Sequence, residues 1–173
     1  MKEIDINNFT TDPFVDFGKN WMALTAGNKE KGFNAMTIAW GHIGSLWERD
    51  QHTNRLPTLI CYVRPSRYTK KFIDSEEYFT VTAFDEEYRR SLAYLGTHSG
   101  KDEDKINKAG LTPVFDQGTT YFREGKLVYI CKKLYHAPLV EKGFIDKGIV
   151  DFNYPKRDFH EMYVGEIIKI LVK

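Results

Sequence analysis

Six segments of the chain alternate apolar with polar residues, or are rich in β-branched and aromatic residues, which is the pattern of β-strands. They lie at 21–27, 33–40, 57–63, 78–84, 126–136 and 162–172. The stretch GNKEKGF, between the first two segments, holds glycine, asparagine and charged residues. This composition predicts a hairpin loop that joins the first two strands.

Helical patterns are fewer and shorter. The segment 85–96 has Asp85 as an N-cap, acidic residues in its first turn, spaced apolar residues and Gly96 as a stop signal, so it predicts a helix. A second helix is expected at 102–109, and a third is expected to begin with Ser66 as its N-cap. Because the helices do not alternate regularly with the strands, the pattern favours a closed antiparallel barrel with helical insertions over a doubly wound parallel sheet.

Length and charge narrow the function classes. At 173 residues the chain can bury a substantial core, and no repeat, low-complexity tract or linker divides it, so we expect one domain spanning 1–173. Lys and Arg number 25 against 24 Asp and Glu, which leaves a formal charge of +1. No global field therefore attracts nucleic acid or an anionic membrane, and any anion must be bound at a local site.

The cysteines and the N-terminus indicate a reducing compartment. Cys61 and Cys131 lie in apolar strand-like runs without CxxC spacing, which favours buried, reduced thiols over a zinc or redox motif. The N-terminal MKEIDINNFT lacks the apolar region of a signal peptide, and no stretch approaches the roughly 18 apolar residues of a membrane helix. We therefore expect a soluble cytoplasmic protein.

The densest cluster of cations and hydroxyls follows a buried strand, in YVRPSRYTKKF. If a helix begins here, its free backbone N–H groups would converge with hydroxyls and an arginine fork, which suits a phosphate of charge about −2. The side chains concerned are Arg64, Ser66, Arg67 and Thr69. The alternative interpretation is a pair of solvated arginines followed by an exposed helix face.

Two other segments carry residues suited to a ligand. LGTHSGKDEDK resembles a P-loop superficially, but its glycine spacing is one short and it follows a helix. A helix-to-helix linker explains this segment except for Lys101 and His98, and Lys101 is a cation able to reach an anion. In FNAMTIAWGHIGSLW, Asn34 and Thr37 interrupt an apolar strand. Trp40 and Gly41 end that strand, either as a flat face and a close backbone approach for a ligand or as a core residue and a loop.

Side-chain catalysis has little support in the sequence. The five histidines show no i, i+4 pair and no HExxH spacing, so no metal site is expected. No GxSxG nucleophile elbow and no GxGxxG fingerprint opening a βαβ unit is present either. If the protein does chemistry, we expect a bound cofactor to carry it.

Several strings in order resemble one family. NAMTIAWG, YVRPSRYTKKFI, FTVTAF, LGTHSGKDEDKINKAGL and LVYICKKLYH resemble the flavin reductase-like, FMN-binding split-barrel proteins, and most closely their flavoredoxin-like branch. The resemblance extends over 21–172. It implies a mainly β fold, a Greek-key split β-barrel with a few short helices. It also implies a homodimer that holds FMN noncovalently in a groove near the subunit interface.

The resemblance implies a role for each candidate residue. The FMN phosphate would be held by Arg64, Ser66 and Thr69, with Arg67 beside them. The family segment along the ribityl chain and the isoalloxazine ring corresponds to Asn34, Thr37, Trp40 and Gly41. Further flavin contacts, at its polar edge, from the late strand and from the C-terminal segment, would come from Lys101, His136 and Phe159, or from His160 beside the last.

The resemblance and the chemistry lead to one main hypothesis, an FMN-dependent oxidoreductase that transfers a hydride from NADH or NADPH to flavin. An alternative of a different class is a flavoredoxin-like electron carrier that a protein partner reduces. A split-barrel protein that has lost its cofactor and serves only as an interaction module is disfavoured, because the candidate phosphate loop is intact.

Overall fold

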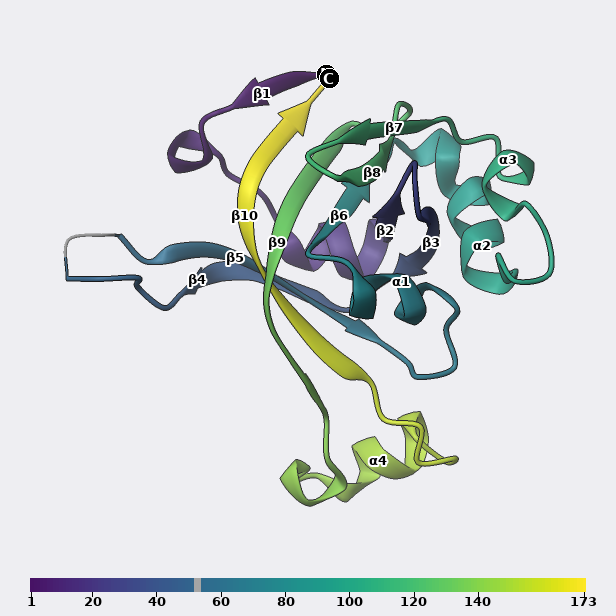
Figure 1. Ribbon diagram of the computed structural model, residues 1–173. Helices are drawn as coiled ribbons and strands as arrows, with labels where there is room; N and C mark the ends of the chain where they lie inside the picture. The colour runs from purple at the N-terminus through teal and green to yellow at the C-terminus, as the bar shows by residue number, and fades with distance from the viewer. Residues whose placement is uncertain (52–53) are drawn as a thin grey trace.

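The computed structural model describes residues 1–51 and 54–173 (Figure 1). Its main sheet has the strand order β3-β2-β6-β9-β10-β5-β4, with β1 also paired to β10. The pairings of this sheet are antiparallel. The strands are β1 (Lys2–Ile4), β2 (Met22–Asn28), β3 (Gly32–Ile38), β4 (Gly41–Leu46), β5 (Leu56–Val63), β6 (Tyr78–Ala83), β9 (Leu127–Pro138) and β10 (Glu161–Val172). A separate antiparallel hairpin contains β7 (Pro113–Asp116) and β8 (Thr119–Phe122).

The strands β9 and β10 hold the two halves of the sheet together. They pair with each other, while β9 also pairs with β6 and β10 also pairs with β5. Their register shifts between Val164 and Gly165 and again between Ile167 and Lys169, and such irregularities bend a strand and increase its twist. Gly165 is required at the first shift, because a Cβ there would lie 2.6 Å from the Phe79 ring. The sheet can therefore curl around a core.

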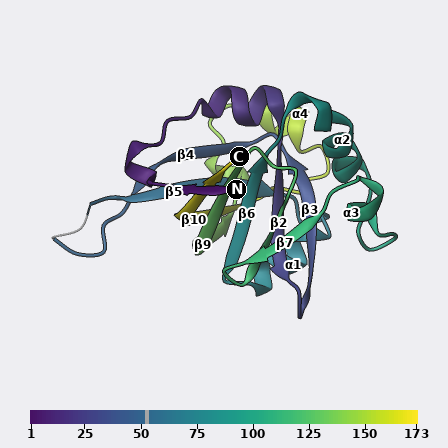
Figure 2. The ribbon, with the colours of Figure 1, turned by 90° about the horizontal axis from the view of Figure 1, so that it is seen from above.

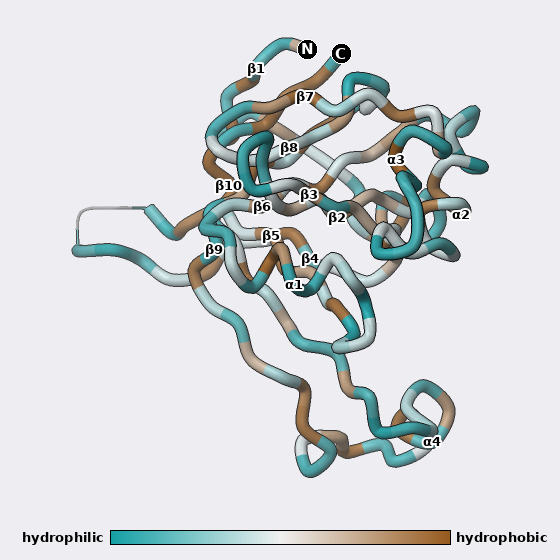
Figure 3. Tube along the Cα trace, turned by 45° about the vertical axis from the view of Figure 1, so that its right-hand side comes forward, coloured by the Kyte–Doolittle hydropathy of each residue, from teal (hydrophilic) through white to brown (hydrophobic). Residues whose placement is uncertain are grey.

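The main core fills the inside of the curled sheet. Its fully buried side chains include Met22, Leu24, Leu59, Phe79 and Tyr163, which come from the four strands β2, β5, β6 and β10. Each such side chain contributes about 1.5–3 kcal/mol when it leaves water. The described parts of the connection between β4 and β5 are mostly hydrophilic, in contrast to the apolar stretches within the barrel (Figure 3).

Short helices cover the edges of the sheet. Within the described residues the α-helices are α1 (Thr69–Ser75), α2 (Arg89–Thr97), α3 (Lys105–Lys108) and α4 (Lys147–Asn153). α2 and α3 lie beside β2 and β3 (Figures 1 and 2), where Leu92, Leu95 and Ile106 form a second core with Ala23 and Ala35. α4 lies beyond the far ends of β9 and β10, on an arm that projects from the barrel (Figure 1).

The predicted strands are confirmed, as is the hairpin that joins β2 to β3. The sequence pattern did not reveal β1, β4, the β7–β8 hairpin or α4. β4 was hidden because its sequence, GHIGSL, contains two glycines and was interpreted as the end of a strand or a loop. An N-terminal π-helix at Phe14–Asn20 was also not expected.

The expected start of the first helix was wrong. Ser66 does not cap it, because α1 begins at Thr69 and is preceded by Tyr68, which makes no side-chain capping bond. Ser66 instead lies in a turn in which the Arg67 N–H donates to the Arg64 carbonyl oxygen over 3.0 Å. The amide of Lys70 donates to the Arg67 carbonyl oxygen, so the backbone here is already partly hydrogen-bonded.

The other two helices also begin or end elsewhere than expected. After Asp85 the chain makes a 3₁₀ turn, Glu86–Tyr88, before α2 begins, and α2 continues through Gly96 to Thr97. The next helix is shorter than 102–109, because its N-cap is Asp104, whose side chain accepts a hydrogen bond from the Asn107 amide. The capping bond of Asp104 thus sets the start of α3, two residues or more after the start expected from the composition of the segment.

The two cysteines behave as expected. Cys61 and Cys131 are free thiols with no exposed surface, and burial raises the pKa of both. They are therefore protonated and unreactive at neutral pH. In the part of the chain that the structure describes, no helix has the length and apolarity to cross a membrane.

Candidate functional site

Three adjoining cavities follow the chain from Met36 to Ile43. The first, the polar pocket, has a volume of about 90 Å³ and is lined by Ser66, Arg67, Thr69, His98, Ser99 and Lys105. The second, the connecting groove, has about 120 Å³ and is lined by Thr37, Trp40, Tyr62, Arg64, Arg67 and His160. The third, the aromatic pocket, has about 610 Å³ and is lined by Phe14, Phe17, Trp40, Tyr62, Phe144 and Tyr154.

Shared walls make these cavities parts of one site. Met36 and Arg67 line both the polar pocket and the groove. Ala39, Trp40 and Tyr62 line both the groove and the aromatic pocket. β3 lies at the edge of the main sheet, so its backbone N–H and C=O groups on the side away from β2 are available to a ligand in the groove.

The polar pocket gathers donors from three segments. Ser66 and Arg67 come from the turn after β5, Thr69 opens α1, and Ser99 follows α2. Arg67 also donates from its guanidinium to the Gly96 carbonyl oxygen over 3.1 Å, which ties the turn to the end of α2. Hydroxyl and guanidinium groups at one place are the donor set expected of an anion site.

Lys105 is the member of this pocket that the sequence pattern missed. Its side chain is buried, with 3 % of the residue surface exposed, and its Nζ donates to the carbonyl oxygens of Leu95 and His98, both over 3.0 Å. Burial, followed by the Arg67 guanidinium, lowers the pKa of Lys105 to about 8. The feature of the sequence that could have identified Lys105 is the DEDK string, because Asp104 caps α3 and the residue after this cap turns inward.

Asn34 lies behind the polar pocket and holds one of its lining residues, Thr69, in place. It is buried, and its Nδ2 donates to the Thr69 hydroxyl over 2.9 Å. Its Oδ1 would lie 2.2 Å from a Cβ on Gly100, so that position must be glycine for the loop to approach. Asn34 therefore fixes both α1 and the loop after α2. It does not line any of the three cavities.

Arg64 lies in the connecting groove and not in the polar pocket. Its guanidinium donates to Asp158 Oδ2 over 2.7 Å and to the Asn153 carbonyl oxygen over 2.8 Å. It also lies over the Tyr154 ring, 5.2 Å from the ring centroid. Its partners lie at the end of α4 and in the segment that follows it, so Arg64 holds this part of the chain against the end of β5. The structure therefore separates it from Ser66 and Thr69.

Thr37 and Trp40 lie on one wall of the groove. The Thr37 hydroxyl donates to the Leu92 carbonyl oxygen and so anchors α2 against β3. Trp40 is 42 % exposed, and its ring lies 4.7 Å from that of His160 between centroids. The Tyr154 hydroxyl is 2.8 Å from His160 Nδ1. Burial and the nearby Arg64 lower the pKa of His160 to about 4, so it is neutral at pH 7.

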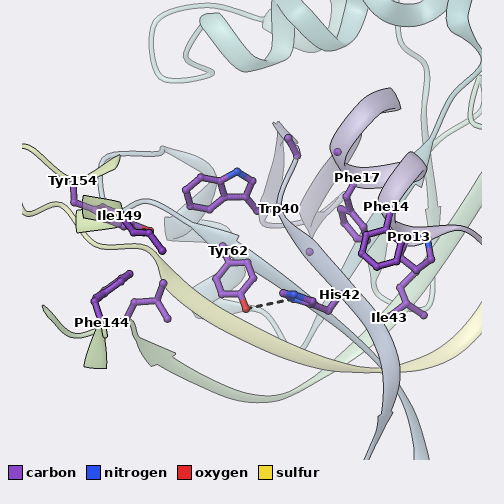
Figure 4. A pocket seen from close by; sticks show the side chains of 14 residues that line it. Pro13, Phe14, Phe17, Trp40, His42, Ile43, Tyr62, Phe144, Ile149 and Tyr154 are labelled. Carbon is purple, nitrogen blue, oxygen red and sulfur yellow. Dashed lines mark hydrogen bonds between the residues drawn. The ribbon is translucent and has the colours of Figure 1, made fainter. Parts of the chain in front are cut away.

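The aromatic pocket lies between the N-terminal π-helix, β4 and the α4 arm (Figure 4). Phe17 packs so closely on Gly41 that a Cβ at that position would be 2.3 Å from its ring. Gly41 thus belongs to the site because it admits Phe17. In the close-up, Tyr62 occupies the middle of the pocket, below Trp40 and opposite His42 (Figure 4).

Besides Asn34, three other predicted residues lie outside these cavities. Lys101 is exposed, and its backbone amide donates to the Ser99 hydroxyl over 3.2 Å. His136 lies on β9, where it pairs with Glu161 and stacks against Tyr163. Phe159 packs on the rings of Tyr154 and Phe144, which puts it behind the wall of the aromatic pocket. Its neighbour His160, the other residue considered there, lines the groove directly.

Comparisons with known proteins show relatives by structure alone. No family model matches the sequence, and no curated protein matches it. A flavoredoxin of Desulfovibrio vulgaris (Miyazaki F) superposes with a TM-score of 0.65 at 21 % identity, over 100 % of this chain and 77 % of its own. An FMN-binding domain of a flavin reductase-like enzyme from Shewanella baltica gives 0.65 at 13 % identity, over 98 % and 75 %. A Streptomyces globisporus NADH:FAD oxidoreductase gives 0.66 at 15 % identity, over 92 % and 79 %.

These neighbours confirm the predicted fold class. They match nearly the whole chain, and they include proteins described as flavin reductases and as flavoredoxins. Their identities are too low to transfer any residue's role. The chain has a mainly β, split-barrel fold, the one seen in FMN-binding flavin reductase-like proteins and flavoredoxins.

Proposed function

We propose that this protein binds FMN noncovalently and is a flavin reductase-like oxidoreductase that takes a hydride from NADH or NADPH. One observation carries the proposal: a small cationic, hydroxyl-rich pocket leads through a groove to a larger aromatic pocket. FMN has the same order of parts, namely a phosphate, a polyhydroxy chain and a flat ring system. The descriptions of the structural neighbours as FMN-binding and flavin-reducing proteins support the same conclusion.

The polar pocket fits a phosphate through its donors. Ser66, Thr69, Arg67 and Lys105 all present hydrogen-bond donors at this place. The Thr69 hydroxyl accepts from Asn34, and a hydroxyl that accepts still has its own proton to donate. An anion beside Lys105 would also favour its charged form and offset the burial that lowers its pKa. We therefore assign the phosphate contacts to Arg67 and Lys105 in place of Arg64.

The groove and the edge of the aromatic pocket fit the rest of the cofactor. The free edge of β3 offers backbone N–H and C=O groups to hydroxyls and to the polar rim of a ring. Trp40 offers an indole face at the junction with the aromatic pocket. When bound, the flavin supplies the two-electron chemistry. The part played by these residues is to bind it, orient it and exclude water.

We also propose a cytoplasmic homodimer. Ile145 and Phe152, on the α4 arm, are 96 % and 86 % exposed, which is unusual for large apolar side chains and typical of a surface that another chain covers. The two free, buried thiols suit a reducing compartment. Sedimentation equilibrium should give twice the chain mass of 20.2 kDa, and Phe152→Ser should shift the protein toward the monomer. A wild-type protein that stays monomeric at high concentration would exclude the dimer.

Anaerobic reduction tests the enzymatic part of the proposal. The protein loaded with FMN should be yellow. NADH or NADPH should bleach the absorption of its oxidised flavin much faster than it bleaches that of free FMN. The same addition to buffer with free FMN is the control. A yellow protein that neither nicotinamide reduces, but that a low-potential protein donor reduces, would exclude the reductase and favour the electron carrier.

A further inference from the structure

The aromatic pocket has the size of a small-molecule site, and in the described part of the chain its lining holds no lysine, arginine or acidic residue. With about 610 Å³ it falls within the roughly 300–1,000 Å³ typical of small-molecule sites. Among the described residues that line it there is no Lys, Arg, Asp or Glu. The cations of the site, Arg64, Arg67 and Lys105, lie in the groove and the polar pocket. The pocket is therefore matched to a neutral ligand.

One polar pair lies within this apolar lining. The Tyr62 hydroxyl is 3.4 Å from His42 Nδ1, and the two rings meet edge to face with centroids 5.8 Å apart. β5 supplies Tyr62 and β4 supplies His42, so paired strands hold both side chains in place. Burial, followed by the nearby Cys61, raises the pKa of Tyr62, so its hydroxyl keeps its proton at neutral pH. With the tautomer of His42 that carries its proton on Nδ1, the Tyr62 hydroxyl accepts from His42 and can donate to a ligand in the middle of the pocket (Figure 4).

The shape of the pocket indicates a planar ligand. Trp40 lies on one side of Tyr62, and Phe14 and Phe17 of the π-helix lie on the other side of the pocket (Figure 4). Phe14 is 91 % exposed, so a ligand beside it would remove a large apolar surface from water. Aromatic faces and edges favour a flat aromatic partner over an aliphatic one of the same size.

We propose that the aromatic pocket binds the electron acceptor of this protein, a neutral planar aromatic carbonyl compound of the quinone class, whose oxygen accepts a hydrogen bond from Tyr62. The proposal rests on the proposed function, since it places the acceptor beside the flavin at Trp40 and Tyr62, the residues that the pocket shares with the groove. A nicotinamide dinucleotide is a poorer occupant of the pocket as a whole, because its diphosphate would find no cation there.

The redox balance of the step is simple. A quinone becomes a hydroquinone by gaining two electrons and two protons. When bound and reduced, the flavin would supply both electrons and one hydrogen, as a hydride. The Tyr62 hydroxyl hydrogen-bonds to the second oxygen, to which the other proton is delivered from water. Tyr62 is neutral before and after the step, because solvent replaces any proton that it passes on.

Binding of 1,4-naphthoquinone to the oxidised protein tests the proposal without turnover. Quenching of tryptophan fluorescence is measured on the protein with its flavin and again after flavin removal, with naphthalene as the ligand that lacks oxygen. Tyr62→Phe keeps the ring and should weaken quinone binding about three- to tenfold while leaving naphthalene binding unchanged. Gly18→Leu adds a side chain to a pocket-lining position where a Cβ meets nothing within 4 Å, so it should block both ligands.

A matched variant separates pocket filling from general damage. Gly44→Leu makes the same change on β4 at a position that also has open space but does not line the pocket, and it should bind quinone as the wild type does. Saturable quinone binding to both protein forms, weakened by Tyr62→Phe and lost in Gly18→Leu, supports the proposal. No binding up to 1 mM, on the order of the weakest useful affinity, overturns it, as does binding that both substitutions leave unchanged.

Two further outcomes keep this test apart from that of the proposed function. If the protein retains no FMN but still binds quinone through Tyr62, the pocket stands as a binding site and the proposed function fails. If the protein retains FMN, and NADH but not quinone quenches the tryptophan fluorescence of the wild type and not of Gly18→Leu, the acceptor assignment fails and the flavin assignment stands. Concentration-dependent dimerisation that Gly18→Leu abolishes would show that a second chain fills the pocket, which also overturns the proposal.

Discussion

Lys105 and Lys101 show how much a side chain's direction matters within one short loop. Lys105 is buried and bonded to two backbone carbonyls, whereas Lys101 is exposed. The sequence indicated a cation in this segment but not which lysine turned inward. That choice depends on where α3 begins, and it begins at Lys105 because Asp104 caps it. Ser66, Arg67 and Thr69, by contrast, could be found from one short string.

Replacing Lys105 should therefore destabilise the fold. Lys105→Met keeps the aliphatic stem but leaves the carbonyl oxygens of Leu95 and His98 without their donor, which should cost about 1–3 kcal/mol in the free energy of unfolding. Lys101→Met is the matched control and should change that free energy by less than about 0.5 kcal/mol. Urea denaturation of both variants at pH 7 measures the difference. Equal, small changes would show that the buried bonds are unimportant.

The neutral His160 should make stability depend on pH. Its pKa of about 4 in the folded protein is below the ordinary 6.5, so between these values the unfolded chain binds more protons. The stabilisation is therefore complete above pH 6.5 and is lost as the pH falls toward 4. Because solvent screens a partly exposed group, we expect a loss of only about 1 kcal/mol between pH 7 and 5.

His160→Phe provides the comparison for that pH dependence. It keeps a ring against Trp40 but cannot be protonated, so its free energy of unfolding should fall less than that of the wild type between pH 7 and 5. The lost hydrogen bond to Tyr154 lowers stability at both pH values and does not affect the difference. Urea titrations at the two pH values measure it. Parallel curves for the two proteins would contradict the lowered pKa.

At the scale of elements, alternation along the chain predicted the strands but not their bends. Period-two patterns follow from one buried face, and β2, β3, β5, β6, β9 and β10 were found on that basis. The β7–β8 hairpin was missed although Gln117 and Gly118 both have positive φ, at 50° and 70°, because only the glycine signals a turn by residue type. The bulges in β10 leave no pattern beyond Gly165 itself.

Gly165 should tolerate no side chain. A Cβ there would be 2.6 Å from the Phe79 ring and 2.8 Å from the Cys131 Cβ, inside a fully buried part of the core. Gly165→Ala should therefore lower the free energy of unfolding by about 1–3 kcal/mol through overpacking. Gly44→Ala, on exposed β4 with open space around it, should be neutral or slightly stabilising. Thermal unfolding of the two variants tests the bend, and equal melting temperatures would contradict it.

At the scale of the whole molecule, the site is assembled from segments far apart in the sequence. The π-helix, the stretch from Met36 to Ile43, the turn after β5, the loop after α2 and the segment after α4 all contribute walls. Sequence alone could nominate several of these segments, but it could not show that Arg64 faces the C-terminal segment while Arg67 faces the polar pocket. That division follows from the sheet order, which brings β10 beside β5.

Arg64 should control the mobility of α4 and the segment after it, residues 147–160. Arg64→Met removes the bonds to Asp158 and the Asn153 carbonyl oxygen and the contact over Tyr154. Hydrogen exchange in 147–160 should accelerate at least about fivefold, in line with the loss of roughly 1 kcal/mol of local stability, while β9 stays protected. Arg157→Met removes only surface ion pairs and is the control. Unchanged exchange in Arg64→Met would show that the segment is held by other contacts.

The central claim is that the polar pocket binds a flavin phosphate, and paired titrations with FMN and riboflavin test it most directly. Only FMN carries the phosphate, so the wild type should bind it at least about tenfold more tightly, as expected for charge-assisted hydrogen bonds of 1.5–3 kcal/mol. Arg67→Met should remove most of that difference, whereas Arg90→Met, an exposed arginine on α2 outside the cavities, should preserve it. Equal wild-type affinities for FMN and riboflavin, or no binding of either, would contradict the account.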